Sequence, residues 1–267
     1  MSKFRTLEIS DSRFESDNLR FMTVKTPNLK GRGDICFFVP PDIPKEKTLP
    51  VVILLHGVYG SAWNWAYSTG VHLKANEMIS SGALPPMAIA MPSDGLWGDG
   101  SAYVPHHGYD YEKWIAMDVF DAMKEKVDNV QKDSPVFIAG LSMGGFGALR
   151  IGAKYGSRFK AIAGHSSITN LEQMKLFVEE DVSVLNQQDP VDNDVFKTFQ
   201  RYRAHLPPIR FDCGSSDQLI DYNRELHRQM QDAGIDHIYE EYPGAHSWSY
   251  WEEHVVDTLH FFANQIR

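Results

Sequence analysis

The chain of 267 residues contains only two cysteines, Cys36 and Cys213, and they lack the close spacing of a metal site. This scarcity excludes a disulfide-stapled mini-protein, and we expect both thiols to be reduced and partly buried. A chain of this length buries roughly three quarters of its unfolded surface, so its core needs no covalent or metal support. Hydrophobic residues make up 43% and charged residues 23%, as in an ordinary globular protein.

Basic residues are also scarce. Lys and Arg number 26 against 35 Asp and Glu, which gives a net charge of -9, and the basic residues form no run longer than scattered pairs. Polyanion binding requires clustered Lys and Arg. We therefore expect neither nucleic acid nor an anionic membrane surface as a partner.

Long apolar runs are missing as well. No stretch approaches the roughly 18 consecutive apolar residues of a membrane-spanning helix. The segment Met1–Glu8 has no apolar core of a signal peptide. These absences predict a cytoplasmic protein, with a secreted protein that has lost its signal peptide as the alternative.

The first forty residues have a β pattern. Leu19–Thr26 and Ile35–Val39 are rich in β-branched and aromatic residues, and turn residues at Pro27-Asn28 and Gly31–Gly33 separate them. The pattern predicts an antiparallel hairpin.

From Leu49 onward, short apolar runs alternate with segments of helical periodicity. The predicted strands are Val51–Leu55, Met87–Met91, Val136–Ala139, Ala161–Ala163, Ile209–Asp212 and Ile238–Tyr242. The predicted helices are Trp63–Ser80, Tyr111–Val130, Met143–Tyr155, Asp221–Ala233 and Ser247–Ile266. This alternation predicts an α/β fold, with a mostly parallel central sheet and helices on both faces, in a single domain spanning residues 1–267.

One connection is longer than usual. Ile168–Pro208 separates two predicted strands and contains acidic stretches at Glu179–Asp181 and Asp189–Asp194. Long connections with structure of their own are often functional. Two interpretations stay open at equal weight, a cap over a site and a solvated acidic excursion.

The segment Gly140-Leu141-Ser142-Met143-Gly144 matches the pattern G-x-S-x-G. It follows the predicted strand Val136–Ala139 and precedes a predicted helix, which is the context this motif requires. A sharp turn there would expose the hydroxyl of Ser142, and the helix N-terminus would supply backbone N–H groups. The alternative is a glycine-rich turn with an incidental serine. The agreement of strand, turn and helix favours Ser142 as a nucleophile.

A serine hydroxyl needs a base, and in this type of fold an acid and a histidine follow in that order. Asp217 lies in the loop after the strand that begins at Ile209, whereas Asp212 lies inside that strand and Asp221 in the next helix. Asp217 is therefore the predicted acid, with helix N-capping as its alternative or additional role. His246 follows the last predicted strand, so it is the predicted base.

Two backbone N–H groups are needed to stabilise an oxyanion. Met143 follows the predicted nucleophile and is predicted to supply one, and Val58, in the loop after His56-Gly57, is predicted to supply the other. A plain turn at a strand end is the alternative for His56-Gly57.

Three aromatic residues, Tyr59, Trp97 and Trp248, adjoin these loops and are candidate substrate-binding residues. Ordinary packing is the alternative for each of them.

His106-His107 could be combined with Asp99 and Asp110 as metal ligands. The spacing matches no metal site, so we predict no metal and favour a solvated loop.

The segment Gly140–Ala148, with Leu55-His56-Gly57 upstream and Pro243–Trp248 near the end, resembles the esterase D group of α/β hydrolases. That group includes S-formylglutathione hydrolases, tributyrin, feruloyl and acetyl-xylan esterases, and mycolyltransferases. The resemblance extends from Phe21 to the C-terminus.

The resemblance implies Ser142 as nucleophile, Asp217 as acid, His246 as base, and Val58 and Met143 as oxyanion donors. It implies no cofactor. The loop Val58-Tyr59-Gly60-Ser61 departs from S-formylglutathione hydrolases and is closer to the tributyrin and feruloyl esterase branch.

The leading hypothesis is a serine carboxylesterase that acts on short-chain acyl esters or aryl or sugar esters through an acyl-enzyme. The alternatives are a thioesterase of the S-formylglutathione hydrolase type, an acyltransferase, and a ligand-binding protein that retains the fold without catalysis. The expected partner is a small-molecule ester, and a homodimer stays open.

Overall fold

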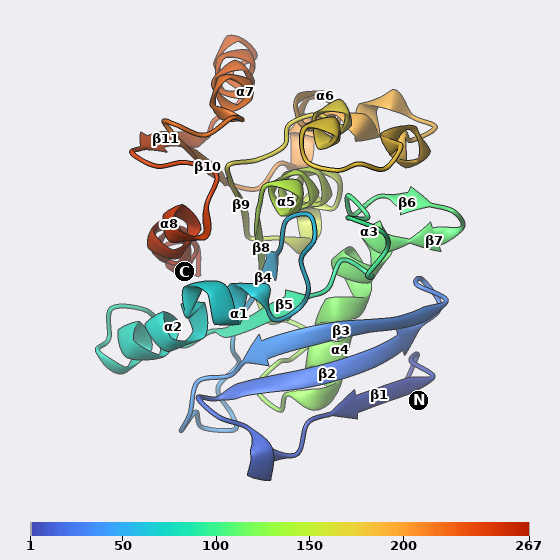
Figure 1. Ribbon diagram of the computed structural model, residues 1–267. Helices are drawn as coiled ribbons and strands as arrows, with labels where there is room; N and C mark the ends of the chain where they lie inside the picture. Colours follow the sequence, from blue (N-terminus) through green and yellow to red (C-terminus); the bar gives the residue numbers. More distant parts are fainter. Residues whose placement is uncertain (1, 267) are drawn as a thin grey trace.

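The computed structural model describes residues 2–266 and contains a central sheet of nine strands in the order β1-β2-β3-β5-β4-β8-β9-β10-β11 (Figure 1). The strands of this sheet are β1 (Thr6–Ile9), β2 (Leu19–Thr26), β3 (Gly31–Phe38), β4 (Val51–Leu55), β5 (Ala88–Pro92), β8 (Val136–Leu141), β9 (Ala161–His165), β10 (Ile209–Gly214) and β11 (Ile238–Tyr242). The strands from β5 to β11 in this order run parallel, and β1, β2 and β3 pair antiparallel. The predicted hairpin and mostly parallel sheet are confirmed.

Helices cover both faces of the sheet (Figure 1). The helices are α1 (Asn64–Thr69), α2 (Val71–Ser80), α3 (Tyr111–Lys113), α4 (Val119–Lys126), α5 (Met143–Lys154), α6 (Val195–Arg201), α7 (Ile220–Asp232) and α8 (Trp248–Ala263). Buried side chains of α1, α2 and α8 pack on one face, and those of α4, α5, α6 and α7 pack on the other. Within residues 2–266, no helix combines the length and the apolar character needed to cross a bilayer.

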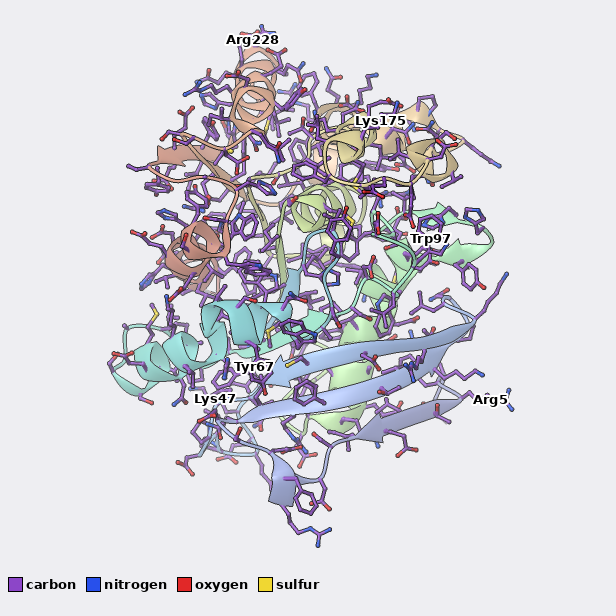
Figure 2. All side chains as sticks on the ribbon, viewed as in Figure 1. Arg5, Lys47, Tyr67, Trp97, Lys175 and Arg228 are labelled. Carbon is purple, nitrogen blue, oxygen red and sulfur yellow. The ribbon has the colours of Figure 1, made fainter. Side chains whose placement is uncertain are left out.

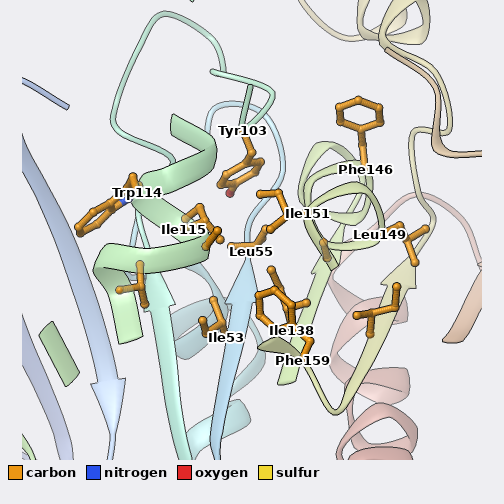
Figure 3. Close-up of a cluster of buried hydrophobic side chains, with 14 of the residues drawn as sticks. Ile53, Leu55, Tyr103, Trp114, Ile115, Ile138, Phe146, Leu149, Ile151 and Phe159 are labelled. Carbon is orange, nitrogen blue, oxygen red and sulfur yellow. The ribbon is translucent and has the colours of Figure 1, made fainter. Parts of the chain in front are cut away.

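Every residue of β4 is buried, and its side chains alternate between two cores. Ile53 and Leu55 join Ile138 of β8 and Phe146 of α5 on one face (Figure 3). The intervening residues of β4 face the core that contains Trp65 of α1. Both cysteines are buried and free, and burial raises the pKa of Cys36 to about 12.

Two predicted helices are interrupted. The segment 63–80 forms α1 and α2 because Gly70 adopts a left-handed conformation, with φ of 62°, between them. The segment 111–130 contains a π-helical turn at Trp114–Asp118, which buries the indole of Trp114 in the core.

Two strand pairs were not predicted. Strand β1 alternates between exposed and half-buried residues at the sheet edge, so it lacks the apolar run that marks a central strand. Strands β6 (Pro105–His106) and β7 (Tyr109–Asp110) form a separate two-stranded hairpin.

The connection 168–208 consists of short turns and one helix. Its 3-10 turns are η4 (Leu171–Leu176), η5 (Val182–Leu185), η6 (Pro190–Asn193) and η7 (Arg203–His205). Leu171 and Met174 are each 1% exposed and belong to the main core. The excursion is therefore anchored to the body of the molecule rather than fully solvated.

Candidate active site

Ser142 occupies a sharp turn between β8 and α5. Its backbone has φ of 53° and ψ of -119°, a conformation that costs free energy for a residue with a side chain. Neighbouring backbone groups hold it, because the Ser142 N–H donates to the His165 carbonyl (2.9 Å) and the Ser142 carbonyl accepts from Ile168 (3.1 Å). The turn places the hydroxyl at the carboxyl edge of the parallel strands, where open α/β sheets bind ligands.

A close backbone approach explains the glycine at 144. A Cβ atom there would lie 2.4 Å from the carbonyl oxygen of Leu55, well inside the closest normal contact. The first turn of α5 can therefore sit against the end of β4 only because residue 144 has no side chain.

Ser142, His246 and Asp217 form a continuous hydrogen-bonded series. The Nε2 atom of His246 lies 3.0 Å from the Ser142 hydroxyl oxygen, and its Nδ1 atom lies 2.9 Å from Oδ2 of Asp217. The Asp217 side chain is buried, and its Oδ1 atom accepts the backbone N–H of Leu219 at 2.8 Å. Asp217 therefore contacts the imidazole and also stabilises the turn before α7.

The neighbouring acids lie elsewhere. Asp221 is on the exposed start of α7, where its side chain is 87% exposed. Asp212 is fully buried, with Oδ2 2.9 Å from Nδ1 of His165 and Oδ1 accepting from the Tyr250 hydroxyl at 2.8 Å. Burial alone would raise the pKa of Asp212, but His165 and Arg210 outweigh burial and lower the pKa below its ordinary value.

Two backbone N–H groups beside Ser142 are free. Within residues 2–266, neither Val58 nor Met143 donates its N–H to a protein acceptor. Their side chains meet at Gly100, where a Cβ atom would lie 2.5 Å from the Met143 sulfur and 3.5 Å from Cγ1 of Val58. Residues 58 and 143, distant in the chain, thus approach the same point.

His56 locks the loop that carries Val58. Its Nδ1 atom lies 2.7 Å from the Gly57 carbonyl, and its Nε2 atom accepts the Asp94 N–H at 3.1 Å. The Tyr103 hydroxyl donates to the His56 carbonyl at 3.0 Å. With both ring nitrogens engaged, His56 fixes the turn that follows β4.

Two aromatic rings that the sequence did not single out flank His246. The centroid of the Phe177 ring lies 5.0 Å from that of the imidazole, and the Trp251 ring lies edge-on at 4.9 Å. Trp251 could have been inferred, since it follows His246 by five residues at the start of α8. Phe177 belongs to the excursion, and no pattern in the sequence connects it to His246.

The three aromatic candidates for substrate binding have different surroundings. Trp248 packs edge-on against Trp65 (6.1 Å) and Trp251 (5.2 Å), and Trp251 in turn contacts His246. Trp97 packs beside the β6–β7 hairpin (Figure 2). Tyr59 is 63% exposed in the loop between β4 and α1.

The prediction of a solvated loop at His106-His107 is wrong for His106, which is only 8% exposed. Its ring is packed between Trp97 (4.5 Å) and Tyr111 (4.6 Å). Burial, with the nearby His107 as a smaller cause, lowers its pKa to about 4. In the described part of the chain, no three His, Cys, Asp or Glu side chains gather as metal ligands.

Known proteins share this architecture along most of the chain. An acetyl esterase of Caldicellulosiruptor saccharolyticus is 25% identical over 261 residues, covering 88% of this chain and 94% of the relative. A ferulic acid esterase structure superposes with a TM-score of 0.81 at 24% identity, covering 98% of this chain and 99% of the other. An S-formylglutathione hydrolase structure from Staphylococcus aureus superposes with a TM-score of 0.79 at 19% identity, covering 96% and 100%.

A family model covers most of the same range. It is described as "Putative esterase" and matches residues 26–262. The chain therefore belongs to this esterase family and is a carboxylic ester hydrolase of the α/β-hydrolase fold.

Proposed function

We propose that the protein is a serine carboxylesterase in which Ser142 is the nucleophile, His246 the general base and Asp217 the acid that orients the imidazole. The observation that carries the proposal is the hydrogen-bonded series, with Ser142 Oγ 3.0 Å from His246 Nε2 and His246 Nδ1 2.9 Å from Asp217 Oδ2. These distances are those required for proton transfer between a nucleophile and its base.

In the first step, the Ser142 oxygen attacks the ester carbonyl carbon while its proton passes to Nε2 of His246. The tetrahedral intermediate carries its negative charge on the former carbonyl oxygen, which accepts the N–H groups of Val58 and Met143. The C–O bond to the alcohol then breaks, and the alcohol oxygen takes the proton from His246.

In the second step, water replaces the alcohol. His246 takes a proton from the water as its oxygen attacks the acyl carbon, and the same two N–H groups hold the second oxyanion. The bond to Ser142 then breaks, the serine oxygen recovers its proton from His246, and the carboxylic acid leaves. Asp217 keeps the Nδ1–H tautomer and stabilises the imidazolium in both steps.

We propose short acyl groups, acetyl included, as the acyl part of the substrate. The support is the relative named as an acetyl esterase, which aligns with 88% of this chain. Aryl and sugar alcohols are the proposed leaving groups, and a comparison of their acetyl esters with feruloyl esters and S-formylglutathione would rank them.

The test is turnover of p-nitrophenyl acetate by the wild type and by Ser142→Ala, with Ser157→Ala as the control. Ser157 is exposed on the turn after α5, away from His246. We expect Ser142→Ala to lose at least about 10³-fold in kcat and Ser157→Ala to match the wild type. Equal rates for wild type and Ser142→Ala would refute the proposal.

A further inference from the structure

Three segments that are distant in the sequence meet beside the N–H groups of Val58 and Met143. They are the 56–60 loop, the 97–100 loop, and residues Phe177–Glu180 of the excursion, which we call the strap. Tyr59 connects the first segment to both of the others. Its N–H donates to the Asp99 carbonyl at 2.7 Å, and its hydroxyl donates to the carbonyl of Phe177 in the strap.

A third hydrogen bond joins the 97–100 loop to the strap. The Asp99 N–H donates to Oε2 of Glu180 at 3.1 Å. The Glu180 carboxylate also lies directly over Gly98, where a Cβ atom would come within 2.4 Å of Oε1. The strap is thus tied at one end to the 56–60 loop and at the other to the 97–100 loop.

These three hydrogen-bonded segments contact the proposed reaction centre at two points. On one side, Gly100 packs against the side chains of Val58 and Met143, the proposed oxyanion donors. On the other, the Phe177 ring packs 5.0 Å from the imidazole of His246. The ring of Phe177 therefore contacts the proposed base, and the carbonyl of Phe177 accepts the hydroxyl of Tyr59.

The backbone of Tyr59 shows that this arrangement needs support. Its φ of 58° lies in the left-handed region, which is unfavourable for a residue with a side chain. Such a conformation persists only where surrounding contacts impose it. The two hydrogen bonds of Tyr59 are such contacts, and Val58 is its immediate neighbour in the chain.

We propose that Tyr59 is a positioning residue that holds the oxyanion N–H of Val58 in register with His246 by tying the 56–60 loop to the strap. This inference rests on the proposed function. Its hydroxyl is engaged by the Phe177 carbonyl, so Tyr59 acts through the protein rather than through the substrate. The consequence is stabilisation of the transition state without a change in ground-state binding.

The test compares Tyr59→Phe with Tyr67→Phe. Tyr67 lies on α1 (Figure 2), is 62% exposed against 63% for Tyr59, and its hydroxyl has no hydrogen-bond partner among the described residues. For Tyr59→Phe we expect kcat on p-nitrophenyl acetate to fall about 5- to 20-fold. KM should stay within about twofold, because acylation and deacylation use the same oxyanion donors and slow together.

A second readout isolates the oxyanion. A methyl trifluoromethyl ketone forms a tetrahedral adduct with the serine, so its affinity should fall by the same factor as kcat. The thermal midpoints of both variants should match that of the wild type. Glu180→Ala should lower kcat in the same way, and Glu180→Gln, which keeps an acceptor for the Asp99 N–H, should restore it.

A rise in KM at constant kcat would overturn the inference and make Tyr59 a substrate contact. Unchanged kcat and ketone affinity, or a fall that follows a loss of thermal stability, would also overturn it. If turnover is lost in Ser142→Ala but unchanged in Tyr59→Phe, the role of Tyr59 is refuted and the proposed function stands. If Ser142→Ala turns over substrate as fast as the wild type, the proposed function itself is refuted.

Discussion

The ring of Phe177 lies 5.0 Å from the ring of His246, inclined by 31°. One residue comes from the excursion and the other from the loop before α8, 69 positions later in the sequence. A change in the excursion therefore bears directly on the imidazole that contacts Ser142.

Replacing Phe177 with Leu should slow turnover as well as lower stability. The smaller side chain leaves a gap beside the imidazole, so His246 can tilt away from Ser142, and we expect kcat to fall about three- to tenfold. Phe196→Leu is the matched control, since Phe196 is also a half-buried residue of the excursion packed on the core. Each variant should lose about 1 kcal/mol in the free energy of unfolding. Equal kcat values for Phe177→Leu and Phe196→Leu would show that Phe177 does not hold His246 in place.

Replacing Asp217 with Asn should be more severe. The amide cannot stabilise the imidazolium and favours the wrong tautomer of His246, so we expect kcat/KM on p-nitrophenyl acetate to fall about 10³- to 10⁴-fold. Asp221→Asn, four residues later on the exposed start of α7, should leave kcat/KM unchanged. A loss below tenfold in Asp217→Asn would show that another group orients the base.

His106 should make stability depend on pH. Burial lowers its pKa from 6.5 to about 4, so between these values the unfolded chain binds a proton that the folded chain does not. The contribution of neutral His106 is therefore complete above about pH 6.5 and is lost as the pH falls toward 4. Urea unfolding of the wild type and His106→Gln across this range should show the difference.

The expected result is a steeper loss for the wild type, on the order of 2 kcal/mol between pH 7 and pH 4 relative to His106→Gln. The exposed His205 provides the control, and His205→Gln should follow the wild type at each pH. Parallel pH profiles for wild type and His106→Gln would contradict the assignment of this pH dependence to His106.

Gly144→Ala should destabilise the fold as well as the site. The added Cβ would lie 2.4 Å from a backbone oxygen of β4, and backbone at the centre of a sheet cannot move aside cheaply. We expect a loss of about 3–5 kcal/mol, measured by urea unfolding or as a low soluble yield. Gly31→Ala, where the nearest atom is 3.4 Å away, should lose less than about 1 kcal/mol.

The local pattern of apolar and turn residues was sufficient to predict much of the fold. The predicted bounds of β2, β4 and β11 match the structure, because turn residues such as Pro, Gly and Asn lie next to the ends of these strands. The break at Gly70 could not be separated from continuous helical periodicity, since a single glycine also occurs inside helices. The edge strand β1 was missed because its pairing with β2 is a long-range property.

For the candidate site, chain order selected three residues that the structure brings together, namely Ser142, Asp217 and His246. Their roles stay predictions until they are tested. The strap could not be inferred, because Tyr59, Asp99 and Glu180 are joined by backbone and side-chain hydrogen bonds that leave no periodic signal. Burial of His106 arises likewise from the hairpin, which packs the imidazole edge-on against Trp97 and stacks it on Tyr111.

Mapping a covalent serine adduct shows whether Ser142 is the reactive nucleophile. The protein is treated with a fluorophosphonate, which phosphonylates an activated serine, and the modified peptide is identified by mass spectrometry. We expect one adduct, on Ser142, that is absent from Ser142→Ala and forms far more slowly in His246→Gln. An adduct on another residue, such as the nearby Ser166 or Ser167, or none in a preparation that turns over p-nitrophenyl acetate, would contradict the assignment of Ser142 as the nucleophile.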